Sequence, residues 1–327
     1  MKKLIPQLLR PGDEIRITAP ASGVKIISPA CRELARQRFE KMGLKVSYGA
    51  NTVDENWDAD GSTTVEKRVE DLHRAFADPN VKAVFTMIGG NNSNQLLDYL
   101  DYRLIAANPK ILCGFSDITA LLNAVYAQTG LVTFSGPHFS SLGMLKGIEY
   151  TIDNMQKMLF EDGSHTIRSS EQWSDDLWFL DQENRCFIDN PGWWFLQEGQ
   201  ARGTLLGGNL GTFNLLLGTP YRPPFEADTV LFIEDTGSVN IADFTRNLQA
   251  LMQQPDFENV KALLIGRFQK NSQVTREQLE FMVERLRPYL KDKPVIANLD
   301  FGHSTPLLTI PVGGTAEIAD GSISLHR

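Results

Sequence analysis

The sequence predicts an α/β protein: an N-terminal domain with a largely parallel sheet covered by helices, followed by a C-terminal domain of mixed α/β structure. Three observations lead to this prediction. A chain of 327 residues exceeds the usual size of one domain, about 100 to 200 residues. Strand-like and helix-like patterns alternate over roughly the first 160 residues, as in βαβ units. A stretch without a clear period then separates this half from a second run of strands and helices.

The N-terminal half alternates between apolar strand patterns and amphipathic helix patterns. The first strand is predicted over 14–20, and apolar side chains at helical spacing predict a helix over 29–43, where Gly43 is a typical stop. A second amphipathic helix is predicted over 63–77. The other predicted strands are 44–48, 81–88 and 109–113, and the other predicted helices begin near 95 and span 118–128.

Residues 164–200 mix polar and aromatic side chains, so we expect them to connect a domain over 1–163 to one over 201–327. In the second domain, strands are predicted at 203–206, 228–233, 261–265 and 294–297, and helices at 241–253 and 275–289. Two short runs around Asp320-Gly321 predict a terminal hairpin.

The composition is that of an ordinary globular protein, with 42% hydrophobic and 22% charged residues. A net charge of −8 and the lack of a Lys/Arg-rich stretch argue against a nucleic-acid partner. No apolar run approaches the roughly 18 residues of a membrane span, and the run after Lys2-Lys3 is too short for a secretory signal. We therefore expect a cytoplasmic protein that acts on a small molecule.

The three cysteines, Cys31, Cys113 and Cys186, show no CxxC spacing. Neither a disulfide framework nor a zinc site is predicted, which fits a reducing compartment, and we expect no metal. Cys113 lies inside an apolar strand, where a thiol is most often a small core residue.

Ser116 is the candidate nucleophile. It follows the predicted strand 109–113 through Gly114-Phe115, and a helix begins directly after it. Open α/β sheets bind their ligands at this end of a strand. The backbone amide of Asp117, at the helix N-terminus, would face an oxyanion. Serine and aspartate at such a turn also cap helices, which is the commoner role when this segment is taken alone.

A nucleophilic serine needs a base, and the base needs an orienting carboxylate. Among the five histidines, His303 is best placed, because glycine and proline around it favour an exposed turn after the predicted strand 294–297. His138 could also line a cleft. Glu234 directly follows the apolar residues of another predicted strand, where it could instead cap the next helix. A serine, a glutamate and a histidine at three strand ends together indicate a serine hydrolase.

Gly89-Gly90 ends the predicted strand 81–88. The backbone of Gly90 could supply a second oxyanion donor, because only glycine lets the main chain approach a substrate so closely. As a phosphate loop the segment is weak, since neither GxGxxG nor GxxxxGK[ST] is present. Ser116 also lacks the GxSxG sequence of the α/β-hydrolase elbow.

Six motifs in this order resemble peptidase family S66, the LD-carboxypeptidases that trim murein peptides and their relatives, the microcin C self-immunity proteins. The resemblance runs along most of the chain. The motifs occupy 11–15, 88–94, 108–110 together with 114–121, 207–210, 231–235 and 302–306.

The resemblance implies a triad of Ser116, Glu234 and His303, with an oxyanion hole formed by the backbone amides of Gly90 and Asp117. It also implies a three-layer, parallel-sheet N-terminal domain like that of class I amidotransferases, a smaller swivelling C-terminal β/α domain, a homodimer, and no metal or cofactor. Asn91 and Asn209, which lie in matching motifs, would contact the substrate.

Residues 91–94, 100–102 with 106–110, and 173–176 look closer to the microcin-immunity branch of the family. That branch stacks an aromatic side chain on the base of a toxic aminoacyl-adenylate analogue. Trp178 is the candidate here, and Trp193-Trp194 is another possible platform. The resemblance therefore implies cleavage of an amide bond in a small peptide-like substrate, a peptidyl or aminoacyl nucleotide.

Two alternatives stay open from the sequence. One is removal of the terminal D-Ala from a murein tetrapeptide, and the other is a non-catalytic module that binds a small molecule. A basic residue in the cleft would favour the murein substrate, because it would hold the free carboxylate. A tryptophan over a base would favour the nucleotide.

Overall fold

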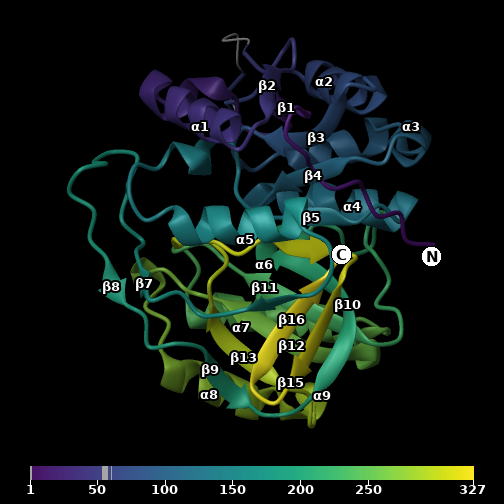
Figure 1. The fold of residues 1–327 in the computed structure, drawn as a ribbon. Helices are drawn as coiled ribbons and strands as arrows, with labels where there is room; N and C mark the ends of the chain where they lie inside the picture. The colour runs from purple at the N-terminus through teal and green to yellow at the C-terminus, as the bar shows by residue number, and fades with distance from the viewer. Residues whose placement is uncertain (1, 54–57, 60) are drawn as a thin grey trace.

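The computed structural model describes residues 2–53, 58–59 and 61–327. These residues form two large sheets with helices around them. In Figure 1 the purple and blue elements of the N-terminal half lie above the green and yellow elements of the C-terminal half. The α/β class predicted from the sequence is confirmed.

The first sheet has six strands in the order β14-β5-β4-β3-β1-β2. Strands β1 to β5 are parallel, in the order typical of flavodoxin-like doubly wound sheets, and β14 is antiparallel to β5. Cys113 is fully buried in this sheet, as expected for a core residue. The strands are β1 (Glu14–Thr18), β2 (Lys45–Tyr48), β3 (Val81–Thr86), β4 (Ile111–Gly114), β5 (Thr133–Ser135) and β14 (Ile310–Val312).

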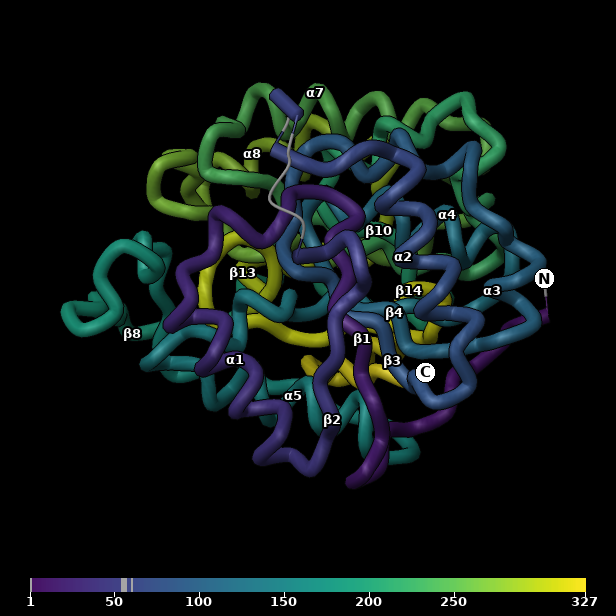
Figure 2. Tube along the Cα trace, turned by 90° about the horizontal axis from the view of Figure 1, so that it is seen from above, coloured from purple at the N-terminus to yellow at the C-terminus, as the bar shows by residue number. Residues whose placement is uncertain are grey.

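Helices cover this sheet, and local sequence sets their ends. The Ser28 side chain accepts a hydrogen bond from the backbone of Cys31 at the start of α1, and Gly130 ends α4 in a left-handed conformation. Helices α2, α3 and α4 pack side by side on one face, and α1 lies on the other (Figure 2). The helices of this half are α1 (Pro29–Lys41), α2 (Val65–Ala77), α3 (Tyr102–Ala107), α4 (Thr119–Thr129) and α5 (Glu149–Phe160).

The second sheet has eight strands in the order β6-β16-β15-β10-β11-β12-β13-β9. Its centre, β10 to β13, is parallel, and the outer strands are antiparallel to their neighbours. The strands are β6 (His165–Ile167), β9 (Trp194–Gln197), β10 (Ala201–Asn209), β11 (Thr229–Glu234), β12 (Val260–Gly266), β13 (Val295–Leu299), β15 (Thr315–Ala319) and β16 (Ser322–His326). Its helices are α6 (Leu210–Asn214), α7 (Ile241–Met252), α8 (Arg276–Arg285) and α9 (Arg287–Leu290).

The connecting segment is more regular than its composition indicates. Its strands β6 and β9 form the two edges of the second sheet. Between them, β7 (Gln172–Trp173) and β8 (Ile188–Asp189) pair into a short ribbon that projects at the left of Figure 1. These strands have two to four residues, too few for a period to be recognised in the sequence.

Two further features differ from the pattern-based expectation. The segment after Gly90 forms a 3-10 helix, η2 (Ser93–Tyr99), where the sequence predicted an ordinary helix. Strand β14 returns from the C-terminal half to form the edge of the first sheet, so the C-terminal half contributes one strand to that sheet. In the described part of the chain, no helix is long and apolar enough to cross a membrane.

Candidate active site

Four strand ends meet between the two sheets. Gly89 and Ser116 follow β3 and β4 of the first sheet, while Glu234 ends β11 and His303 follows β13 of the second. Neighbouring parallel strands present their carboxyl ends at a common edge. The two edges face each other, because the Ser116 and His303 side chains are within hydrogen-bond distance.

Ser116 stands in a sharp turn between β4 and α4. Its φ of 60° is left-handed, a conformation that residues other than glycine rarely adopt. The preceding Phe115 is extended, and a short 3-10 helix, η3 (Ser116–Ile118), follows. A strand, a strained serine and a helix make the geometry of a nucleophile elbow, even without the GxSxG sequence. Gly89 keeps the hydroxyl accessible, since a Cβ there would lie 3.3 Å from Ser116 Oγ.

His303 links Ser116 to Glu234. Its Nε2 lies 2.9 Å from Ser116 Oγ, and its Nδ1 lies 2.7 Å from Glu234 Oε2. An ionised carboxylate only accepts hydrogen bonds, so Nδ1 carries the proton toward Glu234. Nε2 is then free to accept the proton of the Ser116 hydroxyl. This is the tautomer that a general base requires.

Glu234 is buried, and two glycines make room for it. It is 3% exposed. A Cβ on Gly302 would lie 2.8 Å from Glu234 Oε2, and a Cβ on Gly266 would lie 2.8 Å from Glu234 Cβ. Any larger residue at either position would displace the carboxylate from His303.

The surroundings of His303 favour its protonated form. Burial by itself lowers the pKa of His303, but the charge of Glu234, the hydrogen bond to Glu234 and the charge of Asp235 together raise it above its ordinary value. Asp235 is also buried, and its Oδ1 accepts hydrogen bonds from Asn209 and from the backbone of Thr236. An imidazolium formed during a reaction would therefore be stabilised.

A cavity of about 370 Å³ lies next to Ser116. Its wall includes Gly90, His138 and His303, and the connecting segment adds Trp178. A second cavity of about 540 Å³ adjoins it and shares Trp178 among its lining residues. Ser116 thus lines an open pocket large enough for a small molecule.

Comparison with known proteins gives the family. Residues 15–136 match the model of the LD-carboxypeptidase N-terminal domain, and residues 202–318 match that of the LD-carboxypeptidase C-terminal domain, the two parts of peptidase family S66. A putative carboxypeptidase of Treponema pallidum is 50% identical over 318 residues, which cover 97% of this chain and 92% of the relative. The chain belongs to peptidase family S66. It is therefore a peptidase, a hydrolase of peptide or amide bonds.

Solved structures of S66 proteins share the whole fold. A MccF-like protein from Bacillus anthracis superposes with a TM-score of 0.96 at 46% identity, covering 99% of both chains. The microcin C7 self-immunity protein MccF of Escherichia coli is 32% identical over 292 residues, 84% of this chain and 81% of the relative. A structure of MccF in complex with aspartyl sulfamoyl adenosine has a TM-score of 0.87 at 30% identity, covering 99% of this chain and 98% of that one.

Both residues expected to form the S66 oxyanion hole belong to segments next to Ser116: Gly90 lines the same cavity, and Asp117 is the next residue in the chain. Gly90 lines the cavity, and a Cβ there would lie 2.8 Å from Ser22 Oγ. The Asp117 side chain accepts hydrogen bonds from the backbone amides of Asn92 and Ser93, at 3.0 and 2.9 Å. Burial raises the pKa of Asp117, although these bonds act in the opposite direction. They tie the loop of Gly90 to the Ser116 turn, and the oxyanion role of both amides stays a prediction.

The three residues expected to contact substrate lie in different places. Trp178 lines both cavities. Asn91 is exposed and does not line the cavity next to Ser116 in the part of the chain that the structure describes. Asn209 caps α6, where its Oδ1 accepts from Thr212, and its Nδ2 donates to Asp235. The alternative platform Trp193-Trp194 belongs to the β9 region, and Trp194 pairs with Ala297.

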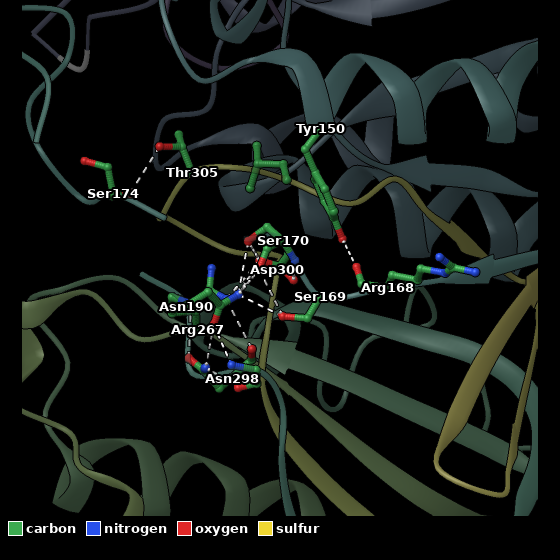
Figure 3. Close-up of polar contacts among 12 residues, drawn as sticks. Tyr150, Arg168, Ser169, Ser170, Ser174, Asn190, Arg267, Asn298, Asp300 and Thr305 are labelled. Carbon is green, nitrogen blue, oxygen red and sulfur yellow. Dashed lines mark hydrogen bonds and ion pairs between the residues drawn. The ribbon is translucent and has the colours of Figure 1, made fainter. Parts of the chain in front are cut away.

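A buried polar cluster, which the sequence patterns did not indicate, holds the connecting segment against the loop of His303 (Figure 3). Arg267 Nη2 lies 2.8 Å from Asp300 Oδ1, with side chains 2% and 0% exposed. Ser170 donates two hydrogen bonds to the same carboxylate, and Asn190 donates to Ser170. The cluster therefore positions the segment that carries Trp178. Across the described residues, no three His, Cys, Asp or Glu side chains gather as a metal site.

Proposed function

We propose that this S66 peptidase hydrolyses the acyl–nitrogen bond of small peptidyl or aminoacyl nucleotides, with Ser116 as nucleophile, His303 as base and Glu234 as its orienting carboxylate. The observation that carries the proposal is the hydrogen-bonded chain of these three side chains beside a cavity lined by Trp178. Similarity to MccF, which has been solved with aspartyl sulfamoyl adenosine, supports the substrate class.

In the proposed reaction, Ser116 Oγ attacks the acyl carbon while His303 Nε2 takes the hydroxyl proton. The backbone amides of Gly90 and Asp117 would stabilise the oxyanion that forms. His303 then donates the proton to the leaving nitrogen, the C–N bond breaks, and the acyl group stays on Ser116 as an ester. A water molecule, deprotonated by His303, attacks the ester and releases the carboxylic acid and Ser116.

The charges of the cavity bear on the choice between the two substrate classes. No Lys or Arg lines it among the described residues. Asp175 and Asp176 line it, and each has its own cation: Lys270 Nζ lies 3.7 Å from Asp175, and Arg185 Nε lies 2.7 Å from Asp176. A free carboxylate of a murein peptide therefore has no unpaired cation in the described wall. The aromatic face of Trp178 instead suits a base.

The substrate assay is the direct test. Incubated with aspartyl sulfamoyl adenosine and, separately, with a murein tetrapeptide, the protein should release aspartate from the first and no D-Ala from the second, as followed by mass spectrometry. Release of D-Ala alone would point to the LD-carboxypeptidase function. Release from neither would contradict both hydrolase versions and favour a binding module.

Variants of Trp178 sharpen this assay. Trp178→Ala should raise KM for the nucleotide substrate by about 5- to 150-fold, because stacking on a base contributes about 1 to 3 kcal/mol. Trp178→Phe keeps an aromatic face and should lose less. Equal KM values for both variants and the unmodified protein would show that Trp178 does not contact the base.

The pH profile should report the environment of His303. Because an imidazolium cannot accept the Ser116 proton, kcat/KM should fall as the pH drops through the pKa of His303. That pKa is raised, so the acid limb should lie above the usual value of about 6.5. Asp235→Asn removes a charge that raises the pKa of His303, and the limb should therefore move to lower pH.

Measurement of kcat/KM between about pH 5 and 9 checks this shift. Glu280→Gln, on the exposed face of α8 where Glu280 pairs with Arg276, removes a charge away from the cavity wall and serves as the control. An acid limb that stays in place in Asp235→Asn would contradict the role given to Asp235.

A further inference from the structure

His138 is a buried histidine of the cavity wall that the proposed reaction does not use. It is 2% exposed and lies shortly after β5, beside Gly89 and Ser116 in the cavity wall. Its ring stacks on Phe115 with centroids 4.3 Å apart, and Phe115 in turn meets the His303 ring edge-on at 5.6 Å. Packing therefore holds the imidazole of His138 in one orientation.

The hydrogen bonds of His138 define which ring nitrogen carries the proton. Nδ1 lies 2.7 Å from Thr86 Oγ1, and Nε2 has no hydrogen-bond partner among the described residues. Thr86 can donate its single hydroxyl proton to the Cys113 carbonyl, 3.3 Å away, and so accepts from Nδ1. The opposite tautomer would bury an N–H without an acceptor, which is rarer than a bare acceptor. Nε2 therefore carries a lone pair.

His138 stays neutral at physiological pH. Burial, followed by the charge of His303, lowers the pKa of His138 to about 3. Nε2 is thus a fixed acceptor in the wall of the cavity. A buried acceptor of this kind indicates a ligand with a hydrogen-bond donor at that point.

The position of Nε2 relative to Ser116 limits which donor it can meet. A Cβ built on Gly89 would lie 3.4 Å from His138 Nε2 and 3.3 Å from Ser116 Oγ, so these two atoms are at most about 6.7 Å apart. In an acyl residue, the α-nitrogen lies about 2.5 Å from the carbonyl carbon. When the carbonyl carbon is bonded to Ser116 Oγ, the α-nitrogen can therefore come within a hydrogen-bond distance of about 2.9 Å of His138 Nε2.

We propose that His138 Nε2 accepts a hydrogen bond from the α-nitrogen of the acyl residue and so selects acyl groups that carry an N–H at this position. The inference rests on the proposed acyl transfer at Ser116. The charges of the wall agree with it. No Lys or Arg lines the cavity in its described wall, so an ammonium group there would meet no like charge from the lining residues. A carbonyl or carboxylate oxygen at the same point would be repelled, because it and His138 Nε2 are both hydrogen-bond acceptors.

Two substrates isolate this contact: aspartyl sulfamoyl adenosine and its succinyl counterpart, which differs only in lacking the α-amino group. The unmodified protein should show a kcat/KM about 10 to 100 times higher for the aspartyl substrate, the range expected for a hydrogen bond to a charged group. His138→Asn can replace Nδ1 toward Thr86 but has no atom at Nε2, so it should lose most of this preference. His138→Gln can place an acceptor near Nε2 and should restore part of it.

The outcomes separate this inference from the proposed function. If His138→Asn lowers kcat/KM equally for both substrates, or for neither, His138 only packs the wall and the inference fails while the proposed function stands. If the unmodified protein cleaves neither substrate, the proposed function fails. Nitrogen-15 NMR then tests the role of His138. An unprotonated Nε2 whose signal shifts on addition of the aspartyl compound but not of the succinyl compound supports the inference. A protonated Nε2 overturns it.

Discussion

Replacing Ser116 with alanine should lower kcat by about four to six orders of magnitude, because the variant removes the protein atom that bonds to the acyl carbon in the proposed mechanism. The fold should persist, since the change deletes one hydroxyl from a turn that β4, η3 and α4 define. Steady-state hydrolysis of aspartyl sulfamoyl adenosine measures the first effect. Thermal unfolding followed by circular dichroism measures the second.

The control is a serine-to-alanine substitution at a position outside the proposed active site. Ser322→Ala, at the exposed turn of the terminal hairpin, removes a hydroxyl that donates to the backbone of Ala319 and should leave hydrolysis near its original rate. A covalent acyl adduct on Ser116, trapped at low pH and seen by mass spectrometry, would support the nucleophile directly. Turnover in Ser116→Ala within tenfold of the unmodified protein would remove Ser116 from the mechanism.

Replacing Glu234 with glutamine should lower kcat by about three to four orders of magnitude while leaving the shape of the site intact. The glutamine amide can donate to His303 Nδ1 and so favour the tautomer that carries its proton on Nε2. That nitrogen could then no longer accept the Ser116 proton. Loss of the Glu234 charge also removes the largest favourable contribution to the imidazolium.

Glu234→Asp is the matched comparison, because it keeps the charge and shortens the reach by one methylene. It should lose less activity than Glu234→Gln, although the hydrogen bond of 2.7 Å to Nδ1 will lengthen. Kinetics of both variants across the pH range give the measurement. If Glu234→Gln loses less activity than Glu234→Asp, His303 depends on the position of the side chain at residue 234 and not on its charge.

The parts of the active site that local pattern predicts are those at strand ends. Continuous apolar runs such as those of β4 and β11 are typical of strands buried on both faces, and they place Ser116 and Glu234 at their carboxyl ends. Within each sheet, parallel strands expose these ends at one edge, so position at a strand end brought the three residues of the predicted triad into consideration. The fold class and the family followed from the same segments.

Other features depend on residues far apart in the chain, which no periodicity connects. The contact of Asp300 with Arg267 and Ser170, and the pairing of β14 with the first sheet, join residues that are far apart in the sequence. Asn209 lies in a motif that indicated substrate contact, yet its amide is used by a helix cap and a buried carboxylate. Pattern shows that a polar side chain stands at a strand end, but not which partner it will meet there.

His138 shows the same division most clearly. The sequence left open that His138 lines a cleft. The hydrogen-bonding roles of its two ring nitrogens came from Thr86, Phe115 and Gly89, each on another segment. Side chains of a strand alternate between faces by local geometry, so their direction can be predicted from the chain alone. The protonation state and hydrogen-bonding capacity of a buried imidazole depend on its neighbours in space, and only packing of the whole chain sets them.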